Sequence, residues 1–245
     1  MTAYLLCATP RSGSTLLCGL LKATGVAGVP ESYFRAQNEA RWAEHLGVPV
    51  RQGSLDYREF AAAVSRAGRT SNGVFGARIM WGTLDRVAFG LGADSEDPAV
   101  QLSVLDRAFD RPRFVHLWRQ DAVAQAVSWL RAEQTGFWHH GEPPRPGAAP
   151  HYDGPRLRAF VRMVNQHNAA WRAWFEAAGV NSYSLRYEDL VADMDDALRR
   201  LLEWLRITVP PGHRIVPLHQ RQADEINTDW IARFHMDFPS DRSSS

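Results

Sequence analysis

The sequence contains almost no lysine. Lys22 is the only one in 245 residues, so arginine supplies nearly all of the 28 basic side chains. Any phosphate or sulfate bound here must therefore be held by guanidinium groups and backbone amides more than by ammonium groups. The formal net charge is only +1, which gives no overall field that would attract the protein to nucleic acid or to an anionic membrane. An anion site has to be local.

Cysteine and long apolar runs are also scarce. Cys7 and Cys18 are the only cysteines, and each lies in an apolar pattern. We expect both to be buried free thiols, which suits a reducing compartment. No apolar stretch approaches the roughly 20 residues that a membrane span needs, and no basic segment followed by an apolar one suggests a leader peptide. We therefore expect a cytoplasmic protein with no membrane span and no nucleic-acid partner.

Apolar strand patterns alternate with helical patterns along most of the chain. Such alternation predicts an α/β fold with a parallel, P-loop-like sheet flanked by helices on both faces. The length suits one large domain, predicted over residues 1–240, with a frayed tail at 241–245. We predict strands at 3–8, 74–80, 113–118 and 182–187, and helices at 15–23, 55–67, 99–109, 121–133, 156–178, 195–205 and about 229–234. Residues 136–155 are rich in proline, glycine and histidine and indicate a lid-like loop.

The first strand is followed by a short polar loop that leads into a helix. The loop contains Arg11, Ser12, Gly13, Ser14 and Thr15. Backbone amides at the start of a helix converge on anions, glycine permits close approach, and arginine can contact two oxygens at once. The Walker A motif does not fit, because it needs a second glycine and a lysine. The loop predicts an anion site at the carboxyl edge of the sheet.

Two further patterns place basic and hydroxyl groups at strand ends. Arg119 directly follows the third predicted strand, and Ser128 lies on the helix after it. Together these two side chains could hold one phosphate group. The fourth predicted strand runs into an Arg-Tyr-Glu-Asp-Leu string that includes Tyr187.

These motifs together resemble the PAPS-dependent sulfotransferases, where PAPS is 3′-phosphoadenosine 5′-phosphosulfate. The Arg-Ser-Gly-Ser-Thr loop is similar to that family's 5′-phosphosulfate loop, and many members have lysine in place of Arg11. By resemblance, Arg119 and Ser128 bind the 3′-phosphate, and Tyr187 lies near the adenine. The resemblance extends over residues 3 to about 234. The cofactor-binding residues that it implies are Arg11, Ser12, Gly13, Ser14, Thr15, Arg119, Ser128, Tyr187, Arg221 and Gln222.

The resemblance is closest to the bacterial trehalose 2-sulfotransferase branch. That branch carries its proposed catalytic carboxylate where this chain has Glu31, so Glu31 is the expected general base, with Arg11 as the second catalytic residue. His116 is the alternative base, although its place within a strand favours packing in the core. Arg78 matches a basic position of the branch. We expect an acceptor site formed by Glu31, Phe34, Arg78 and Trp81.

The expected reaction moves a sulfuryl group from PAPS to a hydroxyl of a small, carbohydrate-like acceptor and releases 3′,5′-ADP. No metal is expected, since the donor is already activated and no ligand cluster is visible. Two alternatives stay open: a P-loop nucleotide-dependent phosphotransferase, and a catalytically silent nucleotide-binding protein. Residues 35–57 and 136–155 depart from the trehalose branch, which leaves the acceptor open. A homodimer is suggested by resemblance alone.

Overall fold

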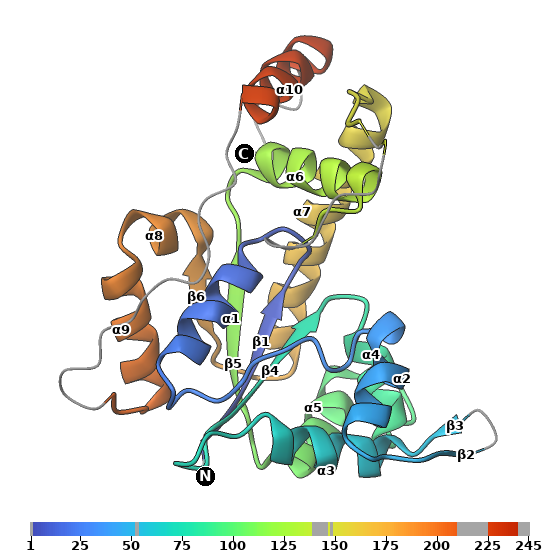
Figure 1. Ribbon diagram of the computed structural model, residues 1–245, viewed down its shortest axis with the longest axis vertical. Coiled ribbons are helices and arrows are strands. Elements are labelled where there is room, and N and C mark those ends of the chain that lie inside the picture. Colours follow the sequence, from blue (N-terminus) through green and yellow to red (C-terminus); the bar gives the residue numbers. More distant parts are fainter. Residues whose placement is uncertain (1, 52–53, 139–146, 148, 210–224, 240–245) are drawn as a thin grey trace.

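A computed structural model describes residues 2–51, 54–138, 147, 149–209 and 225–239. Its centre is a four-stranded sheet with the order β4-β1-β5-β6, in which every neighbouring pair is parallel (Figure 1). The strands are β1 (Ala3–Ala8), β4 (Phe75–Met80), β5 (Arg113–Trp118) and β6 (Tyr183–Arg186). Because all four run the same way, their carboxyl ends share one edge of the sheet.

Helices and one small hairpin complete the described chain. The hairpin pairs β2 (Val50–Arg51) with β3 (Ser54–Leu55). The helices are α1 (Ser14–Ala23), α2 (Ala36–His45), α3 (Tyr57–Ala67), α4 (Leu84–Gly90), α5 (Pro98–Phe109), α6 (Ala122–Thr135), α7 (Gly154–Ala177), α8 (Tyr187–Ala192), α9 (Met194–Leu205) and α10 (Glu225–Asp237). None of the helices in the described ranges is long and apolar enough to cross a membrane.

Both faces of the sheet are covered by apolar side chains. Successive residues of a strand point to opposite faces, and in β1 Leu5 and Cys7 join one core cluster while Tyr4 and Leu6 join another. The first cluster contains residues of α2, α3, α4, α5 and α7, and the second contains residues of α1, α8 and α9. A strand buried on both faces reads as a continuous apolar run, which is why the sequence revealed β1. The predicted α/β fold is confirmed.

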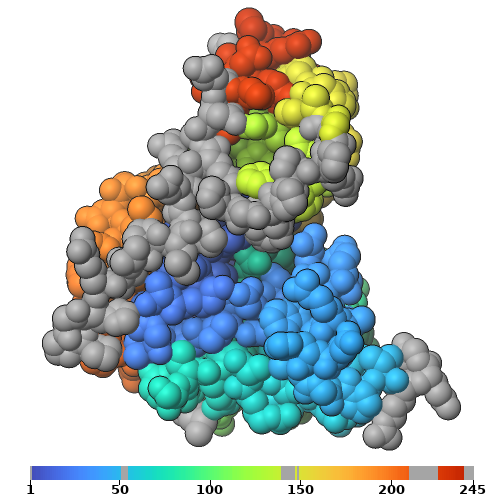
Figure 2. Space-filling view, in the orientation of Figure 1, coloured from blue at the N-terminus to red at the C-terminus, as the bar shows by residue number. Residues whose placement is uncertain are grey.

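A third apolar cluster joins α6, α7 and α10. Phe234 of α10 is fully buried there with Leu157 of α7 and Leu130 of α6. In the space-filling view α10, in red, lies against the yellow start of α7 and the green α6 (Figure 2). The helix α6 begins just after β5, so this group of helices lies next to the carboxyl edge of the sheet.

Three helices and the two strands of the hairpin were not predicted. The helix α2 is largely exposed and buries only Ala43, so it lacks the apolar period that reveals a helix. The helix α8 begins at Tyr187, which was expected to end the fourth strand. The helix α4 has only 7 residues, and the hairpin strands have two residues each.

Candidate functional site

The loop after β1 makes a tight turn into α1. Its backbone takes left-handed angles at Arg11 (φ 62°) and at Gly13 (φ 91°). A side chain at φ > 0 is uncommon outside glycine and marks a strained position that its surroundings must hold. Ser12 is fully buried, and its hydroxyl finds no hydrogen-bond partner among the described residues. A buried hydroxyl without a partner at a helix start fits a loop that receives an anion.

Arg11 reaches across to α6 and to the segment after it. Its Nε donates to Oγ of Ser128 at 2.9 Å, and one terminal nitrogen donates to the backbone oxygen of Trp138 at 2.7 Å. The pKa of Arg11 is lowered by burial first and then by the nearby charges of Arg119 and Arg131. The structure therefore brings Arg11 together with Ser128 and Arg119, which both lie more than 100 residues further along the sequence. Crowded guanidinium groups favour a bound anion between them.

Arg119 stands directly after the end of β5 and is stacked on Tyr187. Its guanidinium carbon lies 4.8 Å from the centre of the Tyr187 ring. The same ring covers Gly13, where a Cβ atom would come within 2.3 Å of it. The Tyr187 ring thus contacts both the loop and Arg119. Three of the predicted cofactor-binding residues, Gly13, Arg119 and Tyr187, therefore lie in one group. Glycine is required at position 13 both by its φ and by this contact.

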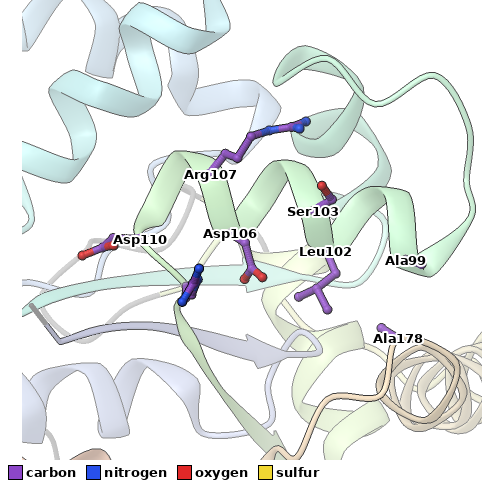
Figure 3. A pocket seen from close by; sticks show the side chains of 8 residues that line it. Ala99, Leu102, Ser103, Asp106, Arg107, Asp110 and Ala178 are labelled. Atoms are coloured by element: carbon purple, nitrogen blue, oxygen red, sulfur yellow. The ribbon is translucent and has the colours of Figure 1, made fainter.

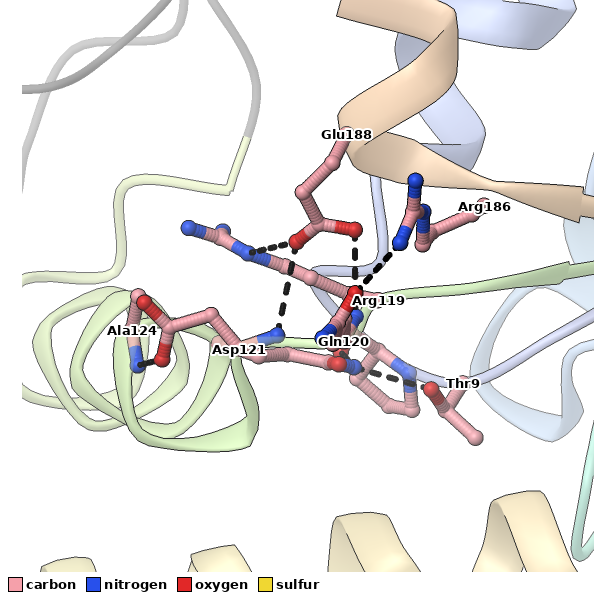
Figure 4. A network of polar contacts seen from close by, with 9 residues as sticks. Thr9, Arg119, Gln120, Asp121, Ala124, Arg186 and Glu188 are labelled. Carbon is pink, nitrogen blue, oxygen red and sulfur yellow. Dashed lines mark hydrogen bonds and ion pairs between the residues drawn. The ribbon is translucent and has the colours of Figure 1, made fainter. Parts of the chain in front are cut away.

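Glu188 connects the segments that carry Arg119 and Tyr187 (Figure 4). Its carboxylate accepts hydrogen bonds from the backbone nitrogens of Gln120 at 3.1 Å and Asp121 at 3.4 Å, and lies 3.8 Å from Nε of Arg119. Gln125 makes a second connection, donating to Oγ1 of Thr9 at 2.8 Å and to the backbone oxygen of Pro10 at 2.6 Å. Neither residue was assigned to the site from the sequence, because single-residue patterns do not reveal long-range contacts.

Arg78 of β4 joins the loop to the segment after α1. It donates to the hydroxyls of Ser32 at 2.8 Å, Ser14 at 3.2 Å and Thr15 at 3.0 Å. Among the described residues its hydrogen bonds go to hydroxyls and none to a carboxylate. A half-buried guanidinium that meets no anion is costly, so this placement favours the expected role of Arg78 in the site.

Glu31 lies beside Arg78 and is paired with a residue that the sequence reading left out. Lys22, in the last turn of α1, places its Nζ 2.5 Å from Oε1 of Glu31. The backbone nitrogen of Arg78 donates to the backbone oxygen of Glu31 at 3.0 Å. The carboxylate is one-third exposed (33%), so it is accessible at the carboxyl edge.

Two other residues predicted for the acceptor site, Phe34 and Trp81, are less available to contact an acceptor. Phe34 is fully buried and packs against Tyr57, Phe60 and Phe109, so its ring has no surface for an acceptor and its position favours a core role. Trp81 is partly buried, edge-on to Trp171 at 5.0 Å, with its backbone nitrogen bonded to the end of β1.

Three further expectations concern the C-terminal cofactor residues, the metal and the alternative base. Arg221 and Gln222 lie outside the described residues. Within the described ranges, no group of three or more His, Cys, Asp or Glu side chains could hold a metal ion. His116 is buried against Phe175, and burial, followed by the charge of Arg172, lowers its pKa to about 4.

A surface hollow lies elsewhere, along α5 (Figure 3). Ser103, Asp106, Arg107 and Asp110 line it together with Ala178. These residues precede β5 and β6, so the hollow lies toward the amino edge of the sheet. It shares no residue with the loop after β1, and none of the predicted site residues lines it.

The fold and the site together define an α/β protein in which arginine side chains and a strand–loop–helix turn come together at the carboxyl edge of a parallel sheet. The family model of the Stf0 sulphotransferases matches residues 3–237, and the chain belongs to this family. It is therefore a sulfotransferase, which replaces the phosphotransferase alternative.

Two curated relatives match over nearly their full length. The trehalose 2-sulfotransferase of Mycobacterium tuberculosis (strain ATCC 35801 / TMC 107 / Erdman) is 31% identical over 261 residues, which cover 96% of this chain and 95% of that protein. The trehalose 2-sulfotransferase of Mycolicibacterium smegmatis is 31% identical over 264 residues, covering 98% of this chain and 97% of that protein. Solved sulfotransferase structures superpose only loosely, as with a domain of a Synechococcus olefin synthase at a TM-score of 0.48 and 15% identity, covering 96% of this chain and 94% of that chain.

Proposed function

We propose that this sulfotransferase uses PAPS as its donor and transfers the sulfuryl group to a hydroxyl of a carbohydrate. PAPS supplies a sulfuryl group that is already attached to a phosphate leaving group. The protein therefore has to bind and orient the donor and the acceptor and to move one proton. The observation that carries the proposal is the convergence of Arg11, Ser128 and Arg119 from three separate segments beside a strand–loop–helix turn.

The proposed donor half of the site consists of the loop at 11–15 with Arg119, Ser128 and Tyr187. The loop amides and Arg11 would hold the 5′-phosphosulfate, while Arg119 and Ser128 would hold the 3′-phosphate and Tyr187 would lie beside the adenine. The hydrogen bond from Arg11 to Ser128 connects the residues proposed for the two phosphate positions. Bound oxygens would replace it, because charge-assisted bonds to phosphate are the stronger ones.

The proposed acceptor half consists of Glu31, Lys22, Ser32 and Arg78. Glu31 would accept the proton of the attacking hydroxyl, which requires an approach of about 3 Å, directly or through one water. Arg78 bonds to the hydroxyls of both the loop and Ser32. It would therefore stabilise negative charge on the group in transit between the two halves.

A carbohydrate acceptor is proposed because both curated relatives are named as acting on trehalose. We also propose that residues 1–240 form one domain, in agreement with the extent of the family match. The cytoplasmic location and the homodimer stay predictions.

An acceptor screen tests the proposal. The purified protein is incubated with PAPS and with a panel of mono- and disaccharides that includes trehalose, with and without EDTA. Mass spectrometry should detect the addition of one sulfuryl group, and EDTA should leave the rate unchanged. Binding of 3′,5′-ADP without any transfer across a broad panel would support the silent alternative, and a rate that is lost in EDTA would contradict the metal-free site.

A further inference from the structure

The only lysine of the chain contacts the proposed base. Lys22 lies nine residues before Glu31, and its Nζ is 2.5 Å from Oε1. Both side chains are one-third exposed. Among the described residues, the recorded hydrogen bond of the Glu31 carboxylate is made by Oε1 alone. The second oxygen, Oε2, accepts no hydrogen bond from the part of the chain that the structure describes.

The main chain of Glu31 is fixed separately from its side chain. The backbone nitrogen of Arg78 donates to the backbone oxygen of Glu31, and its Nε donates to the hydroxyl of Ser32. The titratable and charged groups that surround the carboxylate are Lys22 and Cys18 from α1, Arg78 from β4 and Tyr33 from its own loop. Burial raises the pKa of Cys18 to about 11 and raises that of Tyr33 further still. These two groups are therefore neutral at ordinary pH, and Lys22 is the charged group in direct contact.

We propose, on the basis of the function proposed above, that Lys22 is a positioning residue which holds Oε1 of Glu31 and thereby presents Oε2 to the acceptor hydroxyl. The acceptor O–H bond breaks and its proton moves to Oε2. The acceptor oxygen forms a bond to sulfur, and the bond from sulfur to the phosphate oxygen breaks, with its electron pair staying on that oxygen. Lys22 keeps its proton throughout.

This arrangement predicts a distinct pattern of effects. Because Lys22 holds the carboxylate in place, its loss should slow the chemical step and leave the affinity for 3′,5′-ADP unchanged. A partly exposed ion pair contributes little to folding stability. The loss of Lys22 should therefore change kcat much more than it changes unfolding.

The experiment compares Lys22→Met, Lys22→Gln and Lys22→Arg with the wild type in single-turnover rates at saturating donor and acceptor, and in affinity for 3′,5′-ADP. For Met and Gln we expect the rate to fall several-fold while the nucleotide affinity stays unchanged. Arg should restore most of the rate. Having two neutral variants keeps the test valid if one of them fails to fold.

Matched controls separate this role from a general effect of losing an ion pair. Arg156 and Glu133 form a partly exposed ion pair at 2.6 Å that includes no residue of the proposed site, and Arg156→Met should leave the single-turnover rate unchanged. Adding Lys22→Met to Glu31→Gln should lower the rate no further than Glu31→Gln does alone, because the two residues act as a unit.

Each outcome has one meaning. Folded Lys22 variants with the wild-type single-turnover rate, alongside an inactive Glu31→Gln, would overturn the role of Lys22 and leave the base in place. An active Glu31→Gln would instead remove the base. The absence of sulfuryl transfer by the wild type would contradict the proposed function itself.

Discussion

The two halves of the proposed site are built in opposite ways. In the donor half, Arg11 and Ser128 are 117 residues apart, and Gln125 supports Thr9 from 116 residues away. In the acceptor half, Lys22 and Glu31 are nine residues apart. The donor half depends on the packing of α6 against the loop, whereas the acceptor half is held by α1, β4 and the short segment that connects them.

The halves also differ in charge. Arg11 lies close enough to Arg119 and Arg131 for their charges to lower its pKa, whereas Glu31 and Lys22 form a pair. A site with crowded positive charge gains most from a multiply charged ligand. The Lys22–Glu31 pair carries no net charge and suits a neutral ligand, while the charge of Arg78 lies beside the loop hydroxyls that face the donor half. This difference agrees with a nucleotide on one side and a sugar on the other.

The largest expected effect breaks the acceptor half and leaves the donor half intact. Glu31→Gln keeps the shape of the side chain but cannot take the proton, so kcat should fall by about 10²–10⁴-fold. Affinity for 3′,5′-ADP, measured by calorimetry, should change little. The exposed Glu44→Gln is the control. Glu39 is unsuitable as a control because it bonds to Arg86 and Tyr57. A variant that retains more than about a third of kcat would exclude Glu31 as the base.

The next effect concerns His116, which belongs to neither half. Its pKa of about 4 in the folded protein is below the unfolded value of about 6.5. The unfolded chain therefore binds more protons between these values, and stability falls as the pH drops from about 6.5 to about 4. The full loss is at most ~3 kcal/mol. Urea unfolding at pH 7 and at pH 4.5 should show a smaller difference for His116→Leu than for the wild type.

The same variant bears on catalysis. His116→Leu should keep the acidic limb of the kcat profile if Glu31 is the base. The loss of that limb in a folded His116→Leu would transfer the role of the base to the histidine.

A smaller effect sharpens the donor half. Arg119→Ala should weaken the binding of 3′,5′-ADP about ten- to a hundredfold, because a hydrogen bond to a charged group contributes about 1.5–3 kcal/mol to the binding free energy. The affinity for 5′-AMP, which lacks the 3′-phosphate, should change much less. Arg186→Ala serves as the comparison, since Arg186 is an exposed arginine of the same strand-end region that pairs with Asp189. Equal losses for the two nucleotides would show that Arg119 does not read the 3′-phosphate.

The smallest expected effect tests the contact between the loop and Tyr187. Gly13→Ala places a Cβ against the Tyr187 ring and at a positive φ, which together should destabilise the loop by about 1–3 kcal/mol. Nucleotide affinity should fall accordingly, while the Lys22–Glu31 pair is unaffected. The double variant with Tyr187→Ala should recover the part due to the clash. If Gly13→Ala alone binds 3′,5′-ADP normally, the loop does not need this close approach.

The sequence predicted the main sheet better than the site. β1 and β5 were predicted at the bounds observed, because strands buried on both faces appear as apolar runs between turns. The strand–loop–helix turn at residues 11–15 was also predictable, since its residues are contiguous in the sequence. The pairing of Glu31 with Lys22, the support from Gln125 and the burial of Phe34 depend on which segments pack together. That information is spread over the fold and is absent from any local pattern.

The scarcity of lysine gives the protein a single chemical handle. Reagents that acylate or methylate amines have two targets, the side chain of Lys22 and the chain terminus, because the other basic side chains, apart from histidine, are guanidinium groups. Protein produced in cells that are fed lysine labelled with ¹⁵N at Nζ would carry one labelled side-chain nitrogen per molecule. Its resonance would report directly, without mutation, on whether the neighbouring carboxylate is charged and on when an acceptor arrives beside it.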